Sequence, residues 1–273
     1  MSETILDKIF GAKKLRVESA KQIIDIERLA DLAREKRETA RNHRLRIAME
    51  TNGRLKLIAE FKRASPSKGT INDAVDPAAV AQSYESGGAA AISVLTEEDF
   101  FKGSLNDLRA VRKAVDLPIL RKDFIFDPFQ IYEAAEAGAD AILLIAAMLD
   151  DNALAELQHL AEMILGIDAL VEVHTLEEME RVKKIGAKLI GVNNRDLRSF
   201  DVSLDVSRDL IRHAPADAVM ITESGLKTRD DLVELRGLGY SGFLIGETLM
   251  RSGDPEEEVR ILTTDEHRWT RIK

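Results

Sequence analysis

Residues 127–145 read Asp-Pro-Phe-Gln-Ile-Tyr-Glu-Ala-Ala-Glu-Ala-Gly-Ala-Asp-Ala-Ile-Leu-Leu-Ile. Asp127 and Pro128 are typical of a helix start, because an N-cap acceptor precedes a proline at the first helical position. Apolar residues then repeat at helical spacing, and Gly138 is typical of a helix end. The continuous apolar run from Ala141 predicts a buried strand of a parallel sheet. The stretch is therefore one helix followed by one strand.

This helix and strand unit recurs along the chain. Residues 186–191, Gly-Ala-Lys-Leu-Ile-Gly, resemble residues 138–143 of the first stretch. Short apolar runs begin near Leu57, Ala89, Pro118, Ala141, Asp168, Leu189, Ala218 and Gly242. Eight such runs, separated by stretches with helical periodicity, predict an α/β fold, a closed (β/α)8 TIM barrel. A doubly wound open sheet is the alternative, and no Gly-x-x-x-x-Gly-Lys motif supports it.

The whole chain, residues 1–273, is expected to form one barrel domain, and residues 1–50 are expected to be its N-terminal helical extension. This extension is dense in charge and carries an apolar stripe that predicts one or two helices, formed by Ile23, Ile24, Ile26, Leu29 and Leu32. The stripe fits a helical plug or a dimer surface, and it also fits a helix laid over the open end of the barrel. Residues 63–76 form a long connection after the first strand and are a candidate lid.

Composition excludes several classes of protein. Lys and Arg total 39 against 48 Asp and Glu, a net charge of −9, which argues against a nucleic-acid partner. The chain has no cysteine, so disulfides and thiolate chemistry are excluded and the cytoplasm is the expected compartment. The longest apolar run, residues 141–149, is far shorter than the about 20 residues of a membrane helix, and the N-terminus lacks the apolar core of a signal peptide. We therefore expect no membrane partner.

Ionisable and amide side chains occur at the ends of most predicted strands, where TIM barrels place their chemistry. Glu60 and Lys62 are two residues apart and share a strand face, so they form one opposite-charge pair. Lys122 is expected to point inward because the apolar Leu120 and Phe124 share its face, although the opposite face could also be the inner one. The other strands end in Glu172, Asn193, Arg195, Glu223 and Glu247.

Any one of these residues fits a barrel-interior ion pair or a solvated strand end. Together they would make a costly core, because each buried charge needs a partner. The set therefore predicts an active site. The histidines, at positions 43, 159, 174, 213 and 267, include no pair at metal-ligand spacing, so we expect no metal and assign His174 a supporting or structural role. A divalent metal held by carboxylates is the less favoured alternative.

Two glycine-containing turns follow the seventh and eighth strands, at the usual phosphate site of TIM barrels. They are Glu223-Ser224-Gly225 and Ile245-Gly246-Glu247. Glycine lets the backbone approach an anion closely, and Arg195 lies at the neighbouring strand end. The turns therefore predict a phosphate site. The same residues would also suit tight connections between strand and helix that bind no ligand.

Several blocks of sequence closely resemble the indole-3-glycerol phosphate synthase family of tryptophan biosynthesis. The first three are Ile-Ala-Glu-Phe-Lys-Arg-Ala-Ser-Pro-Ser-Lys-Gly at 58–69, Leu-Thr-Glu-Glu at 95–98 and Leu-Arg-Lys-Asp-Phe at 120–124. Later blocks agree, at 171–173, 191–197, 222–225 and 244–247. The blocks occur in order from the N-terminal extension to the eighth strand, so the resemblance covers the chain.

The resemblance implies an enzyme that acts on 1-(2-carboxyphenylamino)-1-deoxyribulose 5-phosphate. Such an enzyme forms indole-3-glycerol phosphate and releases CO₂ and water without a cofactor. By resemblance, Lys122 is the acid that gives a proton to the ketone oxygen. Lys62, ordered by Glu60, would hold the substrate carboxylate and assist dehydration. Glu172 would transfer the proton in the dehydration, and the polar wall would be completed by Asn193 and Glu223.

The resemblance also implies binding residues. The phosphate would be held by Ser65, Arg195, Ser224 and the amides of Gly225 and Gly246. Some family members have Ser or Thr at the position of Glu247, so here we expect its carboxylate to point away from the phosphate. The anthranilate slot would be lined by Phe101, Phe124, Leu143, Ile145 and Leu197, although a core role fits the three aliphatic residues equally well.

The expected partner is a phosphorylated small molecule, and the expected state is a monomer. Association with other enzymes of the tryptophan pathway stays open. Two other functions also fit a barrel with inward lysines. A Schiff-base aldolase needs a lysine flanked by a carboxylate and a second lysine, and a catalytically silent barrel would serve as a binding protein. The intact polar set argues against the silent barrel.

Overall fold

Eight parallel strands form a closed barrel in the computed structural model, which describes residues 4–51, 53–66, 69–196 and 200–264. Neighbouring strands follow the order β1-β10-β9-β8-β7-β6-β5-β4 around the barrel. The strands are β1 (Leu57–Phe61), β4 (Ala91–Leu95), β5 (Ile119–Lys122), β6 (Ala141–Ile145), β7 (Asp168–Val173), β8 (Leu189–Asn193), β9 (Val219–Glu223) and β10 (Gly242–Ile245). The barrel prediction is confirmed, and each strand begins within two residues of its expected position.

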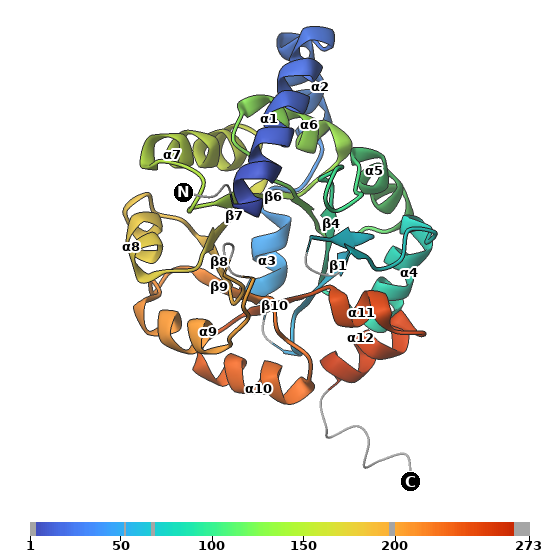
Figure 1. Cartoon of the computed structure of the whole chain (residues 1–273), viewed down its shortest axis with the longest axis vertical. Coiled ribbons are helices and arrows are strands. Elements are labelled where there is room, and N and C mark those ends of the chain that lie inside the picture. The colour runs from blue at the N-terminus through green and yellow to red at the C-terminus, as the bar shows by residue number, and fades with distance from the viewer. Residues whose placement is uncertain (1–3, 52, 67–68, 197–199, 265–273) are drawn as a thin grey trace.

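Helices surround the strands as an outer ring (Figure 1). After the first strand they are α4 (Pro77–Gly87), α5 (Leu105–Ala114), α6 (Pro128–Ala137), α7 (Asp151–His159), α8 (Leu176–Lys184), α9 (Asp205–Leu210), α10 (Arg229–Leu238), α11 (Glu247–Arg251) and α12 (Pro255–Thr263). Two short segments continue α7 and α9, the π-helix η1 (Leu160–Ile164) and the 3-10 helix η2 (Ile211–His213). None of the helices in the described ranges is long and apolar enough to cross a membrane.

The stretch 127–145 folds as its letters predict. The side chain of Asp127 accepts a hydrogen bond from the Phe129 amide at 2.9 Å and so caps the start of α6. Gly138 ends the helix with φ at 93°, a left-handed conformation in which a side chain would be strained. All five residues of β6 are buried, because the helices cover the outside of the barrel and side chains fill its inside.

One glycine-rich stretch has the letters of a dinucleotide-binding motif but not its structure. Residues 237–242 read Gly-Leu-Gly-Tyr-Ser-Gly, which matches Gly-x-Gly-x-x-Gly. That motif requires a turn from a strand into a helix. Here the stretch leads from α10 into β10, in the opposite order, and Gly239 serves as the C-cap of α10 with φ at 122°. The stretch therefore only connects α10 to β10.

The N-terminal extension contains three helices, where one or two were expected. They are α1 (Ile5–Ile23), α2 (Ile26–Glu38) and α3 (Arg44–Glu50). The apolar stripe is divided between two helices, because α1 ends at Ile23 and α2 starts at Ile26. Both isoleucines are exposed, whereas Leu29 is buried against Phe129 of α6.

The plug and the cover were predicted as alternatives, and different helices of the extension take the two positions. Leu45 and Met49 of α3 are buried among residues that begin the strands, including Leu189. The Arg46 amide donates to Asp168, the first residue of β7, at 3.0 Å. Helix α3 therefore closes the N-terminal end of the barrel. Helix α1 contacts the opposite end, where the predicted site lies.

Candidate active site

One pocket at the carboxyl ends of the strands brings together every predicted site residue within the described ranges. Leu197 lies outside those ranges. The lining includes Glu60, Lys62, Ser65, Phe101, Lys122, Phe124, Leu143, Ile145, Glu172, Asn193, Arg195, Glu223, Ser224, Gly225, Gly246 and Glu247. Because these residues come from eight strand ends far apart in the sequence, the closed barrel assembles them.

Lys122 is at the centre of the polar wall. It ends β5, and its Nζ lies 2.6 Å from Oε2 of Glu223 and 3.2 Å from Oε2 of Glu172. Both glutamates are buried, so little solvent screens the three charges. The inward orientation predicted for Lys122 is therefore confirmed.

The three charges shift one another's ionisation. Burial acts against the charge of Lys122, but the carboxylates of Glu223 and Glu172 outweigh it and hold the pKa of this lysine well above its usual range. Burial raises the pKa of Glu223 to about 7, although the ammonium of Lys122 acts in the opposite direction. The raised pKa of Lys122 favours its ammonium form, which can donate a proton, over the neutral amine that a nucleophile would need.

Lys62 and Glu60 form the second charged pair, as predicted from their spacing on one strand face. Lys62 Nζ lies 2.8 Å from Glu60 Oε1. Gly246 faces this pair, since a Cβ placed on Gly246 would overlap Oε1 of Glu60. The lack of a side chain at Gly246 thus leaves room for the Glu60 carboxylate.

Asn193 connects the charged wall to the next loop. Its side-chain amide donates to Glu172 Oε1 at 3.0 Å, and its Oδ1 accepts the Arg195 amide at 3.0 Å. His174 contacts the backbone behind this residue, with Nδ1 2.7 Å from the Asn193 carbonyl oxygen. His174 is absent from the pocket lining, which agrees with the supporting or structural role expected for it.

The turn after β9 has an unusual backbone. Ser224 and Gly225 have φ values of 67° and 79°, two successive left-handed residues. Asn194 holds the turn, because its Nδ2 donates to the carbonyl oxygens of Glu223 and Ser224, both at 3.1 Å. Sequence reasoning did not assign Asn194 this task, and its position next to Asn193 was the only available signal.

Glu247 follows β10 and lines the pocket edge. Its Oε1 lies 3.2 Å from Nε of Arg251, one turn later on α11. Arg251 therefore provides a partner for the carboxylate outside the predicted phosphate site. Thr248, the next residue, also lines the pocket and was not predicted.

Apolar residues line the other end of the pocket. The rings of Phe101 and Phe124 have centroids 6.2 Å apart and are tilted by 39°. The sequence allowed a helix over the open end of the barrel, but it did not identify the residues that cover these rings, because the search for site residues was confined to strand ends. That cover is α1, which contributes Ile5, Leu6 and Ile9 to the lining. Their spacing on one helix face is the signal that could have found them.

The pocket contains no arrangement that resembles a metal centre. Within the described ranges, no group of three or more His, Asp or Glu side chains is placed to hold a metal ion. The carboxylates of Glu172 and Glu223 are directed at the ammonium of Lys122 instead.

This chain is similar to known proteins over most of its length. The family model described as indole-3-glycerol phosphate synthase matches residues 6–262. The chain belongs to the indole-3-glycerol phosphate synthase family. The indole-3-glycerol phosphate synthase of Carboxydothermus hydrogenoformans is 47% identical over 268 residues, covering 94% of this chain and 98% of that protein.

Other relatives carry the same name. The indole-3-glycerol phosphate synthase of Variovorax paradoxus is 44% identical over 94% of this chain and 98% of its own length. Among solved structures, 3-hexulose-6-phosphate synthase from Salmonella typhimurium has a TM-score of 0.61 at 14% identity, over 76% of this chain and 96% of that one. Such low identity shows a shared fold alone, whereas the indole-3-glycerol phosphate synthase relatives show the family.

Proposed function

We propose that this chain catalyses the ring closure of its family, from 1-(2-carboxyphenylamino)-1-deoxyribulose 5-phosphate to indole-3-glycerol phosphate, CO₂ and water. The observation that carries the proposal is the partly buried ammonium of Lys122, held between the buried carboxylates of Glu172 and Glu223 beside the Lys62–Glu60 pair. A ring closure onto a ketone needs a proton donor at the carbonyl oxygen, and this lysine is a charged donor in a pocket of suitable chemistry.

The pocket has an anionic-ligand end and an aromatic end, which match the two ends of the substrate. The phosphate fits the turn of Ser224 and Gly225, with Arg195 and the Gly246 amide beside it. The anthranilate ring fits beside Phe101 and Phe124. The ketone between the two ends then faces the polar wall around Lys122.

The chemistry divides among the wall residues. Lys122 gives a proton to the ketone oxygen while the ring carbon that bears the carboxylate forms the new carbon–carbon bond to the former carbonyl carbon. Loss of CO₂ returns the bond electrons to the ring and restores its aromaticity. The new hydroxyl then leaves as water and a proton is lost, which completes the indole. Lys62, paired with Glu60, holds the substrate carboxylate, and Glu172 transfers the proton in the dehydration.

A Schiff-base aldolase would need a neutral lysine as nucleophile. The raised pKa of Lys122 disfavours that form. We therefore keep the aldolase only as an outcome of the test.

The test is a spectroscopic assay of the purified chain with the ribulose phosphate substrate, in the presence of excess EDTA. We expect the absorbance of indoleglycerol phosphate to appear, because the proposed acids are ammonium and carboxylic groups. Loss of activity with EDTA and recovery with a divalent ion would contradict this mechanism. Covalent trapping by borohydride in the presence of substrate would favour the aldolase, and binding without turnover would favour the silent barrel.

We further infer that the chain works as a monomer in the cytoplasm. In support, one chain supplies both charged pairs, the phosphate turn and the helix that covers the pocket. The absence of cysteine makes the protein compatible with a reducing compartment. Sedimentation of the purified chain at micromolar concentration tests the monomer.

A further inference from the structure

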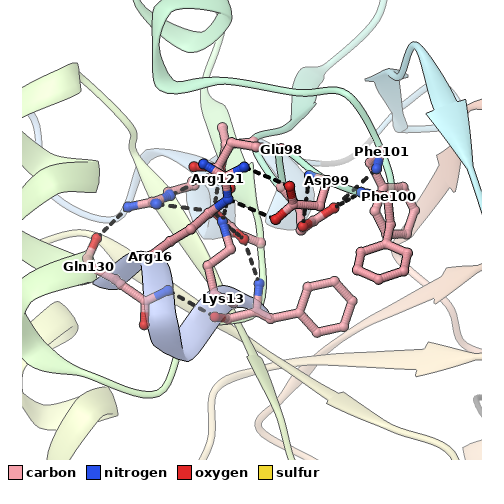
Figure 2. A network of polar contacts seen from close by, with 12 residues as sticks. Lys13, Arg16, Glu98, Asp99, Phe100, Phe101, Arg121 and Gln130 are labelled. Carbon is pink, nitrogen blue, oxygen red and sulfur yellow. Dashed lines mark hydrogen bonds and ion pairs between the residues drawn. The ribbon is translucent and has the colours of Figure 1, made fainter. Parts of the chain in front are cut away.

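Lys13 is a buried lysine far in sequence from the catalytic wall. It lies on α1, one turn after Ile9, and only 2% of its surface is exposed. Its ammonium reaches two carboxylates, at 2.5 Å from Glu98 Oε2 and 2.9 Å from Asp123 Oδ1. Figure 2 shows Lys13 at the meeting point of α1 and the loop that carries Glu98. A buried ammonium with two partners fixes the position of the helix that carries it.

The contact with Asp123 leads directly to one ring of the aromatic end. Asp123 is fully buried, and its Oδ1 accepts the amide of Phe124 at 2.9 Å. Burial acts against its charge, but Lys13 and Arg121 outweigh it and hold the pKa of this carboxyl below its usual range. Arg121 also donates to Asp123 Oδ2 at 3.0 Å, so the carboxylate keeps one cationic partner when Lys13 is replaced.

The contact with Glu98 leads to the other ring. The preceding residue, Glu97, is buried, and its carboxylate accepts the amides of Asp99, Phe100 and Phe101 at 3.1, 2.8 and 3.0 Å. This carboxylate shapes the loop into a compact turn that presents Phe101 to the pocket. Lys13 holds the turn against α1 through the neighbouring Glu98.

We propose that Lys13 is a positioning residue that sets the geometry of the aromatic end of the substrate site. The proposal rests on the proposed function, which places the anthranilate ring there. A single ammonium joins three walls of that end, namely the Ile9 face of α1, the Phe101 loop and the Asp123–Phe124 strand end. Lys13 does not line the pocket, so it acts through these walls.

The expected consequence is selective. Without the ammonium, α1 and the Phe101 loop lose their shared anchor, and the slot for a flat ring widens. The phosphate turn at Ser224 is held by Asn194 instead, so we expect it to keep its shape. Replacement of Lys13 should therefore weaken binding of the aromatic part of the substrate and leave binding of its phosphate unchanged.

The experiment compares Lys13→Met with Arg16→Met in the full chain. Arg16 is the matched control, because it lies on the same helix and pairs with Asp99 of the same loop, while it approaches Glu98 only to 3.9 Å and its side chain is 47% exposed. Exposed pairs contribute little. We expect Lys13→Met to raise KM by about tenfold with kcat within about threefold of wild type. This is the pattern when substrate and transition state lose the same binding energy. We expect Arg16→Met to leave both KM and kcat within about twofold.

Two fragments locate the effect. 2-Aminobenzoate probes the aromatic end and inorganic phosphate probes the other, each by calorimetric titration of wild type and variants. Lys13→Met should weaken the binding of 2-aminobenzoate and leave the binding of inorganic phosphate unchanged. The proposal would be overturned if Lys13→Met weakened the binding of both fragments equally, or if it bound 2-aminobenzoate as tightly as wild type does. If Lys13→Met does not fold, Glu98→Gln decides by the same criteria, because this side chain is partly exposed and its replacement removes the negative charge from only one of the two contacts.

If the proposed function is wrong, the experiments give a result that differs from the one expected if only the role of Lys13 is wrong. In that case wild type forms no indoleglycerol phosphate, while the fragment titrations still show whether Lys13 controls the aromatic end. A fall in thermal stability with unchanged selectivity between the fragments would assign Lys13 a purely structural role.

Discussion

The ammonium of Lys122 contacts one oxygen of Glu223, Oε2 at 2.6 Å, while the other oxygen of the same carboxylate, Oε1, is buried without a hydrogen-bond partner in the described part of the chain. Gly191 of β8 lies beside this free oxygen. A carboxylate with one oxygen engaged and one unpartnered is poorly solvated, which accounts for its raised pKa of about 7. The wall around Lys122 therefore depends on where Glu223 is held.

The first prediction concerns Lys122 itself. Lys122→Met removes the ammonium and keeps most of the volume, so we expect kcat to fall by about 10²- to 10⁴-fold, as for loss of a general acid. Substrate binding should stay within a few-fold, because the phosphate turn and the aromatic end are untouched. Steady-state kinetics and calorimetric binding measure the two quantities. A kcat near that of wild type would show that another group donates the proton.

The second prediction concerns Gly191. A Cβ at this position would lie 2.5 Å from Glu223 Oε1, so Gly191→Ala must displace the carboxylate away from β8. With Glu223 moved from its contact, Lys122 loses part of the charge that raises its pKa, and the alkaline limb of the pH–rate profile should shift to lower pH. Gly237→Ala is the control, because open space surrounds that position. An unchanged profile in Gly191→Ala would show that Glu223 does not set the ionisation of Lys122.

The sequence was sufficient to predict the barrel, because its strands are continuous apolar runs and its helices begin and end at recognisable caps. It also predicted the polar wall, since a parallel barrel places all strand ends at one edge. A helix over the open end was one of the alternatives that the sequence allowed, but the residues of this cover could not be predicted in the same way. Ile5, Leu6 and Ile9 are ordinary apolar residues of a helix, and only the packing of α1 across the barrel makes them pocket residues. The anchor at Lys13 was also missed, because its partners Glu98 and Asp123 are 85 and 110 residues away.

The third prediction concerns the phosphate turn. Gly225 has φ at 79°, and a Cβ there would lie 2.5 Å from Cγ1 of Val202, so Gly225→Val strains the turn in two ways. We expect KM for the phosphorylated substrate to rise more than kcat falls. Inorganic phosphate should raise the melting temperature of wild type and not of the variant, and 2-aminobenzoate binding should not change. Equal protection of both proteins by phosphate would place the phosphate site elsewhere.

The last prediction gives Glu172 the dehydration step. Its Oε1 accepts a hydrogen bond from Asn193 at 3.0 Å and its Oε2 lies 3.2 Å from Lys122 Nζ. These two contacts fix the carboxylate at the carboxyl end of β7. A carboxylate there can take the proton lost when the indole ring forms and return it to the leaving hydroxyl, whereas an amide of almost the same volume can do neither. Glu172→Gln should therefore fold and bind substrate normally and turn over slowly.

The reaction step that slows in Glu172→Gln shows whether Glu172 transfers the dehydration proton or only keeps Lys122 protonated. Single-turnover quench experiments on Glu172→Gln should show an intermediate that accumulates after carbon–carbon bond formation. The charge of Glu172 also raises the pKa of Lys122, so its removal lowers that pKa and moves the alkaline limb of the pH–rate profile to lower pH. If only ring closure slows and no intermediate accumulates, Glu172 acts by keeping Lys122 protonated, and the dehydration needs another base. Asn193→Ala is the matched control, because it removes the hydrogen bond to Glu172 but keeps the charge of its carboxylate.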